Sequence, residues 1–374
     1  MAPSSLSFVS KIFVIVTVIV ALMLKQQPWH RTIDRSTLVS TRFGEWAVVV
    51  GASEGLGAAW ADALCAHGLN VLMIARRGDV LKQQAQDILH RHTTTTTTTM
   101  GNTSSSSSVS LCHIETLVQD VRHFQKTKTI LSRKFQDHTY GLLVWNAALN
   151  QPGYFMDSDI QFQWNIIDLS IQSVLGVTHA FLHHLLGHNH PNVEDQNKAT
   201  MQKTTTMQQQ QQTNHPKRPR RGGIVFMSSM AGIVGNAYIA NYAATKAWTT
   251  VFAHGLAEEL EPEGVRVLAC LAGATLTPNY YRQLIPLSSS SSSSSNDSPP
   301  RNNDDWATQT PQQVVSECLE ELITGQSPSI ATGIVNKVAR FVMTRFIPPA
   351  TAIKFISQET KKRVLIPDRK SRRE

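Results

Sequence analysis

Cysteine is scarce in this sequence, with four residues in a chain of 374. Cys65, Cys112, Cys270 and Cys318 are far apart and show no CxxC or mixed Cys/His spacing. This excludes a disulfide-rich secreted module and gives no indication of a metal site. Because Cys65 and Cys270 lie in apolar periodic stretches, we expect buried free thiols in a reducing compartment and no bound metal.

Charge is scarce as well: charged residues make up 17% of the chain, with 35 Lys and Arg against 27 Asp and Glu. A net charge of +8 would fit a nucleic-acid partner, but the basic residues gather at 217–221 and at the C-terminus. That distribution is typical of a solvated loop and a basic tail, which face anionic lipid or a phosphorylated cofactor. We therefore expect no nucleic-acid partner.

Uncharged polar residues, in runs of Thr, Ser and Gln, replace the missing charges. Without these runs the chain has about the right length for one large α/β domain, which excludes two equal domains. We expect the runs to be disordered surface loops between elements. The expected organisation is a membrane anchor or targeting segment at 1–30, an α/β domain at 43–287 with insertions at 93–108 and 189–222, a low-complexity loop at 288–304, a C-terminal helical extension at 305–366 and a charged tail at 367–374.

The first thirty residues contain an uninterrupted apolar run, IFVIVTVIVALML at 12–24. Extended back to Leu6, with only Lys11 charged, the run approaches the length that spans a bilayer. We expect an N-terminal membrane helix, and a cleaved signal or targeting peptide is the alternative. More positive charges follow the run than precede it, which places the main domain on the cytosolic side.

Beyond this segment, short apolar runs alternate with longer amphipathic ones, as a parallel α/β sheet requires. The pattern predicts a Rossmann-type doubly wound parallel sheet in a single domain. The expected strands are 46–50, 70–74, 110–117, 141–145, 223–227 and 265–270, and the expected helices are 58–67, 80–91, 124–135, 160–186 and 240–260.

A glycine-rich turn, GASEGLG, follows the first expected strand and opens the first helix. Glycines in such a turn let the backbone approach a pyrophosphate, which binds at the helix N-terminus. The spacing is GxxxGxG and a simple packing turn is the alternative, but the strand–turn–helix placement favours a dinucleotide. The turn residues expected to bind the cofactor are Gly51, Ser53, Glu54, Gly55, Leu56 and Gly57.

Two arginines, Arg76 and Arg77, follow the second expected strand, where a Rossmann-type site reads the adenosine ribose. An acidic residue there would repel a 2′-phosphate, whereas guanidinium groups bind one. Surface arginines that begin a helix are the alternative, and Glu54 counts mildly against a phosphate site. The pattern favours NADP(H) over NAD(H).

Ser229 stands 13 positions before Tyr242, and Lys246 follows the tyrosine by four positions. Tyr242 and Lys246 therefore share one helix face. An ammonium near a phenol stabilises the phenolate, so we expect Lys246 to lower the pKa of Tyr242. Tyr242 becomes a candidate general acid toward a carbonyl oxygen or general base toward an alcohol, and Ser229 would hydrogen-bond the same oxygen.

On these motifs the chain resembles the short-chain dehydrogenase/reductase superfamily from about Phe43 to Thr277, and the resemblance is expected to extend to about Pro367. The residues that carry the resemblance are the turn at 51–57, Asp120-Val121, Asn146-Ala147-Ala148, Ser229, Tyr242, Lys246 and the segment 272–277.

The resemblance implies that Asp120 contacts the adenine, that Asn146 supports the central strand and that Thr277 lies near the nicotinamide carboxamide. It also implies that Lys246 holds the nicotinamide ribose. The remaining residues implied to contact the cofactor are Val121, Ala147 and Tyr242.

Within the superfamily, residues 43–47 and 68–71 look like the membrane-anchored branch of hydroxysteroid dehydrogenases and very-long-chain 3-oxoacyl-CoA reductases. This resemblance implies lipid metabolism at the endoplasmic reticulum membrane and pairing of two copies of the chain as a homodimer.

Ser170 departs from the pattern. The superfamily usually has an Asn there, whose backbone carbonyl holds a proton-relay water at a helix kink. A serine carbonyl can serve in the same way, so Ser170 stays a candidate catalytic residue. The departure leaves open a non-catalytic NADP-binding membrane protein.

Apolar and aromatic side chains follow Thr277 and favour a lipid or steroid-like substrate; they are Tyr280, Tyr281, Leu284, Ile285 and Leu287. Apolar residues also recur at helical spacing from Ile334 to Phe346. We interpret this stripe as core packing, with a membrane-facing helix as the alternative.

The sequence thus predicts an NAD(P)-dependent oxidoreductase that uses NADPH to reduce a hydrophobic carbonyl, such as a 3-oxoacyl-CoA or a steroid. Oxidation of a lipid alcohol with NAD(P) on the same residues is the alternative. The candidate catalytic residues are Ser229, Tyr242, Lys246 and Ser170.

Overall fold

The computed structural model describes residues 39, 42–100, 103–187, 222–284, 308–364 and 366. The expected anchor at 1–30, the loop at 288–304 and the tail at 367–374 lie outside these residues, as does the insertion at 189–222 apart from its last residue. The described residues belong to one compact unit.

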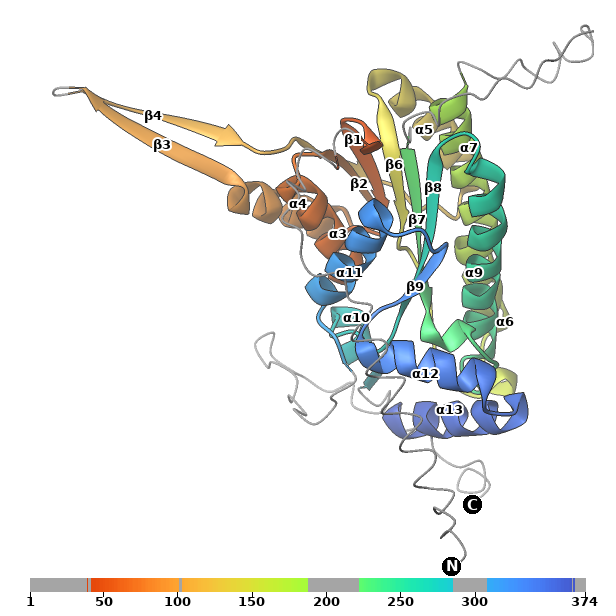
Figure 1. The fold of residues 1–374 in the computed structure, drawn as a ribbon. Coiled ribbons are helices and arrows are strands. Elements are labelled where there is room, and N and C mark those ends of the chain that lie inside the picture. Colours follow the sequence, from red (N-terminus) through yellow and green to blue (C-terminus); the bar gives the residue numbers. More distant parts are fainter. Residues whose placement is uncertain are drawn as a thin grey trace, which may run out of the picture. The chain divides into compact units, whose positions relative to one another are not determined.

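Seven parallel strands form one sheet in the order β5-β2-β1-β6-β7-β8-β9 (Figure 1). Every residue of β1, β6 and β8 is buried, which explains why their sequences are almost entirely apolar, with Arg266 of β8 as the exception. The doubly wound parallel sheet predicted from the sequence is confirmed. The strands are β1 (Trp46–Val50), β2 (Asn70–Ala75), β5 (Ile114–Val118), β6 (Tyr140–Trp145), β7 (Gly222–Ser229), β8 (Val265–Ala272) and β9 (Ser329–Ala331).

Helices cover both faces of the sheet. One core cluster joins the sheet to α3 (Gly55–Ala66), α4 (Gly78–Arg91) and α11 (Pro311–Thr324). The other joins it to α5 (Phe124–Asp137), α7 (Ser173–Leu186) and α9 (Ala240–Leu260). Figure 1 shows these two groups on opposite sides of the strands. The short α10 (Pro278–Leu284) and the C-terminal pair α12 (Ile334–Arg345) and α13 (Pro349–Arg363) lie toward the carboxyl ends of the strands.

The expected helix 160–186 is interrupted. It consists of α6 (Ile160–Ile167), a π-helical turn η2 (Asp168–Gln172) and α7. Hydrophobic periodicity did not predict the turn, because one added residue barely shifts an apolar stripe. The combined helix is the one described segment long and apolar enough to cross a membrane, but half of its most apolar window is buried in the domain, as in a core helix.

The prediction for the Thr/Ser tract at 93–108 is wrong. We expected a disordered loop followed by a strand at 110–117, but the tract forms an antiparallel hairpin of β3 (Thr93–Met100) and β4 (Thr103–Ser110), and β5 begins at Ile114. Threonine is β-branched and favours extended backbone, so a polar run can pair with itself. The hairpin forms its own two-stranded sheet, separate from the main one (Figure 1).

The cysteine prediction is wrong for one pair. Cys65 of α3 and Cys112, just before β5, form a disulfide with their Cα atoms 5.2 Å apart. The two are 47 positions apart in sequence and come together only in the folded chain, so their spacing gave no signal. Cys270 and Cys318 are free and buried, as expected.

The interpretation of the stripe from Ile334 to Phe346 as core packing is also wrong. Asn336 is the one buried residue of α12, and Phe346 is 62% exposed. Part of α12 faces a cavity instead, because Ala339 and Met343 line it. The segment expected as a helical extension also contributes β9 to the sheet and α11 to the core.

Candidate active site

A cavity of about 780 Å³ opens at the carboxyl ends of β1, β2, β6 and β7. The strand order reverses between β1 and β6, and ligands of doubly wound sheets bind at such a point. Gly57 and Ser170 do not line the cavity. The sequence-predicted residues that do line it are Gly51, Ser53, Glu54, Gly55, Leu56, Arg76, Arg77, Asp120, Val121, Asn146, Ala147, Ser229, Tyr242, Lys246 and Thr277.

The glycine-rich turn brings the backbone close to the end of β6. Gly51 has a φ of +83°, and a Cβ there would lie 2.7 Å from the Ala147 nitrogen. The Asn146 side-chain amide donates to the Gly51 carbonyl at 2.9 Å, which ties the turn to β6. Helix α3 begins at Gly55, so its free N–H groups face the cavity, as an anionic pyrophosphate requires.

Gly57 does not line the cavity but has no room for a side chain: an added Cβ would lie 2.0 Å from the Gly51 carbonyl oxygen. We expect Gly57→Ala to displace the turn, to lower the free energy of unfolding by about 1–3 kcal/mol and to weaken dinucleotide binding at least tenfold. Thermal denaturation and fluorescence titration measure both effects.

Gly255→Ala is the matched control, because no atom lies within 4 Å of a Cβ built there and the position is inside α9. Alanine is the better helix former, so this variant should be equally or slightly more stable. Equal stability and binding in the Gly57 and Gly255 variants would refute the packing argument.

The two arginines after β2 have different environments. Arg77 forms an ion pair with Glu54 at 2.9 Å and donates to the Ser53 hydroxyl at 3.3 Å. Glu54 also pairs with Arg282 of α10. Arg76 is exposed and lines the cavity. The Glu54 carboxylate, which in the sequence counted against a phosphate site, is therefore paired with the guanidinium groups of Arg77 and Arg282. Of the two arginines after β2, Arg76 is the one that does not pair with Glu54.

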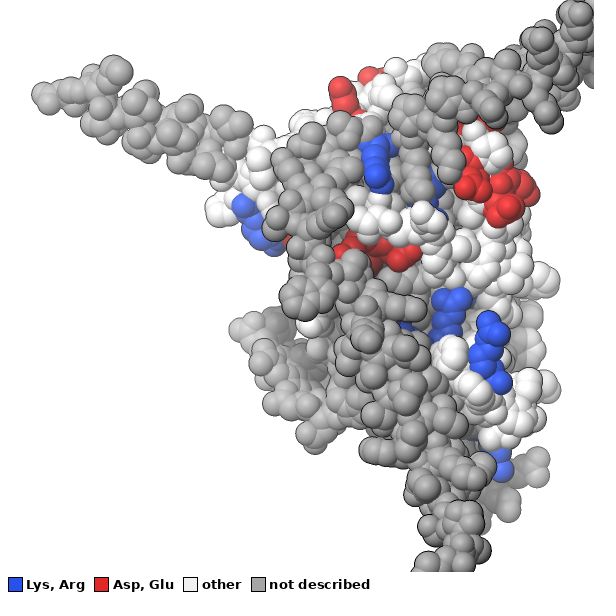
Figure 2. Space-filling model, in the orientation of Figure 1, with Lys and Arg blue, Asp and Glu red and all other residues white. Residues whose placement is uncertain are grey.

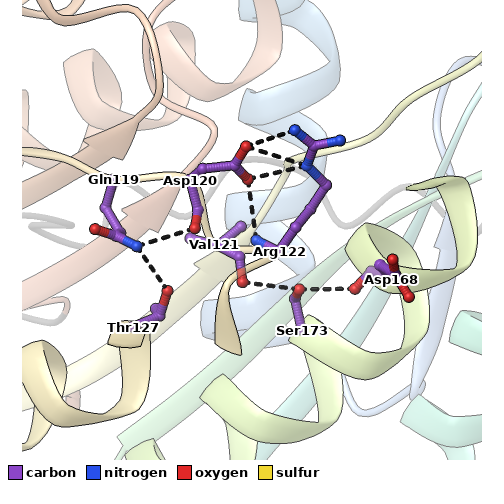
Figure 3. Close-up of polar contacts among 7 residues, drawn as sticks. All are labelled: Gln119, Asp120, Val121, Arg122, Thr127, Asp168 and Ser173. Carbon is purple, nitrogen blue, oxygen red and sulfur yellow. Dashed lines mark hydrogen bonds and ion pairs between the residues drawn. The ribbon is translucent and has the colours of Figure 1, made fainter. Parts of the chain in front are cut away.

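Asp120, in the loop between β5 and α5, is hydrogen-bonded and ion-paired to Arg122 (Figure 3). The Arg122 Nε lies 3.1 Å from both carboxylate oxygens, Nη2 lies 2.6 Å from Oδ2, and the backbone N–H adds a further bond. Burial alone would raise the pKa of Asp120, but the bonds from Arg122 outweigh burial and lower it. An adenine bound beside Asp120 would therefore contact a carboxylate that already accepts hydrogen bonds from Arg122.

Ser173 connects this loop to the π-helical turn (Figure 3). Its buried hydroxyl lies 2.9 Å from the Val121 carbonyl and 2.7 Å from the Asp168 carbonyl. Its backbone N–H also bonds to Asp168, which is the i→i+5 bond of a π turn. The helix distortion is therefore present although Ser170 replaces the usual Asn; the Ser170 hydroxyl is buried without a hydrogen-bond partner among the described residues.

Ser229, Tyr242 and Lys246 meet at the end of β7. Ser229 is the last residue of β7 and accepts the Ala231 N–H at 3.2 Å. Tyr242 and Lys246 lie on α9, and the Lys246 ammonium lies 5.6 Å from the centre of the Tyr242 ring. Lys246 donates to the Met227 carbonyl at 2.6 Å. A serine hydroxyl, a phenol and an ammonium thus border one cavity.

The prediction that Lys246 lowers the pKa of Tyr242 is wrong for this structure. Burial raises the pKa of Tyr242, and the hydrogen bond with Ser229 only partly opposes it. Burial lowers the pKa of Lys246 to about 8. The ammonium bonds to a backbone carbonyl and lies over the ring, so desolvation dominates both groups in this state.

Thr277 lies against the glycine-rich turn and lines the cavity. Its methyl group would lie 3.0 Å from a Cβ at Gly55, and its hydroxyl accepts the Tyr280 N–H at 3.1 Å, at the start of α10. The site residues that sequence reasoning missed come from loops and from the C-terminal helices, where single residues carry no periodic signal: Asn150, Asn236, Arg282, Met343, Phe355, Ile356, Glu359 and Arg363.

Charged side chains do not form a continuous basic surface on the face that Figure 2 shows. Among the described residues, blue and red groups stand apart with white residues between them. Nor does any group of three or more His, Cys, Asp or Glu in the described part of the chain have the arrangement of a metal site.

A family model described as short chain dehydrogenase matches residues 45–193 and 197–283. The match contains the glycine-rich turn, the arginines, Ser229, Tyr242 and Lys246.

Similar proteins include a hydroxysteroid dehydrogenase and a 3-oxoacyl-CoA reductase. A 7beta-hydroxysteroid dehydrogenase of Clostridium sardiniense is 23% identical over 241 residues, which are 64% of this chain and 73% of that protein. A very-long-chain 3-oxoacyl-CoA reductase of Meyerozyma guilliermondii is 24% identical and matches over 60% of this chain and 54% of its own length. A solved structure of a 7beta-hydroxysteroid dehydrogenase superposes with a TM-score of 0.61 at 20% identity, covering 85% of this chain and 98% of that one. At this identity the superposition shows the fold alone.

Proposed function

We propose that this chain, which belongs to the short chain dehydrogenase family, uses NADPH to reduce a hydrophobic ketone or 3-oxoacyl thioester to the corresponding alcohol. Membership makes the chain an oxidoreductase that acts on CH–OH and C=O groups. The cofactor form, the direction and the substrate are the proposal.

The observation that carries the proposal is the convergence of Ser229, Tyr242 and Lys246 on one cavity wall. Burial raises the pKa of Tyr242, so the phenol stays protonated at neutral pH and can act as a general acid. The Ser229 hydroxyl, bonded to Tyr242, would hold the carbonyl oxygen beside the phenol.

The nicotinamide, when bound, supplies the hydride that reaches the carbonyl carbon. Tyr242 gives its proton to the carbonyl oxygen, and Lys246 stabilises the phenolate that results. The Ala231 N–H orients Ser229 at 3.2 Å, and Ser228 fixes β7 to α9 through a 2.8 Å bond to the Lys246 carbonyl.

The cavity fits a dinucleotide. A Cβ at either Gly51 or Gly57 would clash with backbone, so only glycine allows the tight turn that would present the start of α3 to a pyrophosphate. Arg76 would bind a 2′-phosphate, because its guanidinium is exposed at the cavity and not paired with Glu54. NADP(H) is the cofactor form that this charge favours.

The substrate end is apolar, which supports a lipid-like carbonyl. Leu149, Ile239, Met343 and Ile356 line the cavity, and so does Phe355, 57% exposed at its edge. Following NADPH oxidation at 340 nm with 3-oxoacyl thioesters, steroids and retinal tests the proposal. Absence of turnover with all of them would overturn it.

The pH dependence follows from Lys246. With a pKa of about 8, well below that of an ordinary lysine, the ammonium is charged below pH 8 and neutral above it. We expect kcat/KM for NADPH, which reports the free enzyme, to fall as pH rises through about 8. Stopped-flow or steady-state rates between pH 6 and 10 measure this profile.

The raised pKa of Tyr242 separates the two groups, because the phenol keeps its proton through the same range. Circular dichroism over the same pH range is the control for unfolding. A flat profile up to pH 9.5 would contradict the role of the Lys246 charge.

We further propose that residues 12–24 attach the chain to the endoplasmic reticulum membrane, on the strength of their length and apolarity. The charges around this run favour a cytosolic domain, whereas the Cys65–Cys112 disulfide favours oxidising surroundings. Protease treatment of intact vesicles distinguishes the two: digestion of the domain supports the cytosolic side, and protection supports the lumen.

A further inference from the structure

Two asparagine side chains at the cavity have oxygen atoms without partners. Asn236 is 5% exposed, and its Oδ1 is buried with no hydrogen bond among the described residues. The Oδ1 of Asn150 is likewise buried and has no hydrogen-bond partner among the described residues. Both residues line the cavity that Ser229 and Tyr242 also line. Buried amide oxygens are nearly always paired in native proteins, so an unpaired pair at one cavity requires an explanation.

The loops that carry these amides are firmly held by their backbones. The Gly153 N–H donates to the Tyr238 carbonyl at 2.8 Å, which joins the loop after β6 to the loop before α9. The rings of Tyr154 and Tyr238 meet edge to face at 5.3 Å. The Ala237 N–H donates to Ser357 of α13 at 2.9 Å. The backbone that follows Asn236 is therefore fixed both to the loop after β6 and to α13.

Tyr238 is the one described residue other than glycine with a positive φ, at 69°. A bulky side chain rarely adopts this conformation, which persists only where surrounding contacts impose it. It lies two residues after Asn236, in the loop that leads to Tyr242. The local strain is a second sign that this loop is shaped for a ligand rather than for stability.

We propose that Asn236, together with Asn150, which lines the same cavity, binds a hydroxyl group of the substrate near its reacting carbonyl. This inference rests on the proposed function and names the substrate class: hydroxylated hydrophobic ketones. A carboxamide both donates and accepts, and a hydroxyl does the same, so the pair bonds in either amide orientation. The terminal torsion of Asn is soft, and no described partner holds the Asn236 oxygen, so the amide can turn toward the ligand.

Asn236 and Asn150 would be specificity residues rather than catalytic ones. A ketone without the hydroxyl leaves the amides unpaired in the complex, and sites built for a hydroxyl discriminate strongly against such analogues. The apolar lining of the cavity would bind the carbon skeleton of both compounds equally. The preference should therefore depend on the hydroxyl alone.

The test compares ketones that differ only in a hydroxyl next to the carbonyl: benzoin against deoxybenzoin, and 2-hydroxy-1-phenylethanone against acetophenone. We expect the wild-type chain to prefer the hydroxylated member of at least one pair by roughly tenfold or more in kcat/KM. Asn236→Leu, similar in size, should abolish that preference, because it lowers kcat/KM for the hydroxylated ketone more than for its deoxy analogue. Asn279→Leu, at an exposed asparagine elsewhere on the cavity, should keep the wild-type ratio.

Equal kcat/KM for both members of every pair in the wild type, or an unchanged ratio in Asn236→Leu, would overturn the inference. If Asn236→Leu unfolds, Asn236→Ala gives the same comparison. Absence of turnover with every ketone would overturn the proposed function instead. Calorimetric affinities for benzoin and deoxybenzoin in the presence of NADP+ then decide the inference: tighter benzoin binding lost in the variant supports it, and equal affinities reject it.

Discussion

Tyr242→Phe should lower kcat for ketone reduction by roughly 10²–10⁴-fold, the usual contribution of a general acid. The change removes only the hydroxyl that would protonate the carbonyl oxygen. The ring remains under the Lys246 ammonium, 5.6 Å from its centre, so the packing of α9 against β7 should persist. NADPH affinity, measured by fluorescence titration, should change less than threefold.

Tyr281→Phe is the matched control for this result. Tyr281 lies on α10 beside the cavity but does not line it, so loss of its hydroxyl should leave kcat within about twofold of the wild type. Near-normal turnover in Tyr242→Phe would reject Tyr242 as the acid. A loss of NADPH binding in parallel with turnover would indicate a structural effect instead.

Arg76→Asp should reverse the cofactor preference. Hydrogen bonds between charged groups contribute about 1.5–3 kcal/mol, so losing one contact to a 2′-phosphate weakens NADPH by roughly 10–150-fold. The new carboxylate would repel the phosphate and accept a ribose 2′-hydroxyl, which favours NADH. We expect the ratio of kcat/KM for NADPH over NADH to fall by about 100-fold or more.

A comparison of alanine variants sharpens this prediction. Arg77 is paired with Glu54 at 2.9 Å, so Arg77→Ala removes a charge that is already compensated. Arg76→Ala removes one that Glu54 does not hold. NADPH affinity should therefore drop more in Arg76→Ala than in Arg77→Ala. The reverse order, or an unchanged preference in Arg76→Asp, would contradict the assignment of Arg76 to the phosphate.

The central strands could be predicted because β1, β6 and β7 are buried almost throughout and contain apolar runs. β1 (Trp46–Val50) and α9 (Ala240–Leu260) have the predicted bounds. The features that the apolar pattern did not predict are of two kinds, one local and one that joins distant parts of the chain. The π turn adds one residue within a continuous apolar pattern, and the Cys65–Cys112 bond joins positions 47 apart in sequence.

For the site, motifs at strand ends predicted which residues would gather at one cavity, because carboxyl ends of parallel strands meet at one edge. Their electrostatic state could not be predicted. Lys246 follows Tyr242 on one helix face, yet burial dominates the pKa of both groups. The pairing of Glu54 with Arg282 spans 228 positions. Asn150 and Asn236 are single amides in loops, and no pattern marks them.

The disulfide closes a covalent ring at the base of the Thr/Ser hairpin, because Cys65 and Cys112 lie on either side of it. Within such a ring the entropy of closure grows only with the logarithm of length. Threonine or serine residues could be gained or lost between β3 and β4 while the distance from α3 to β5 stays fixed. The repetitive tract is thus a segment whose length can drift between related chains without disturbing the cofactor end of the sheet.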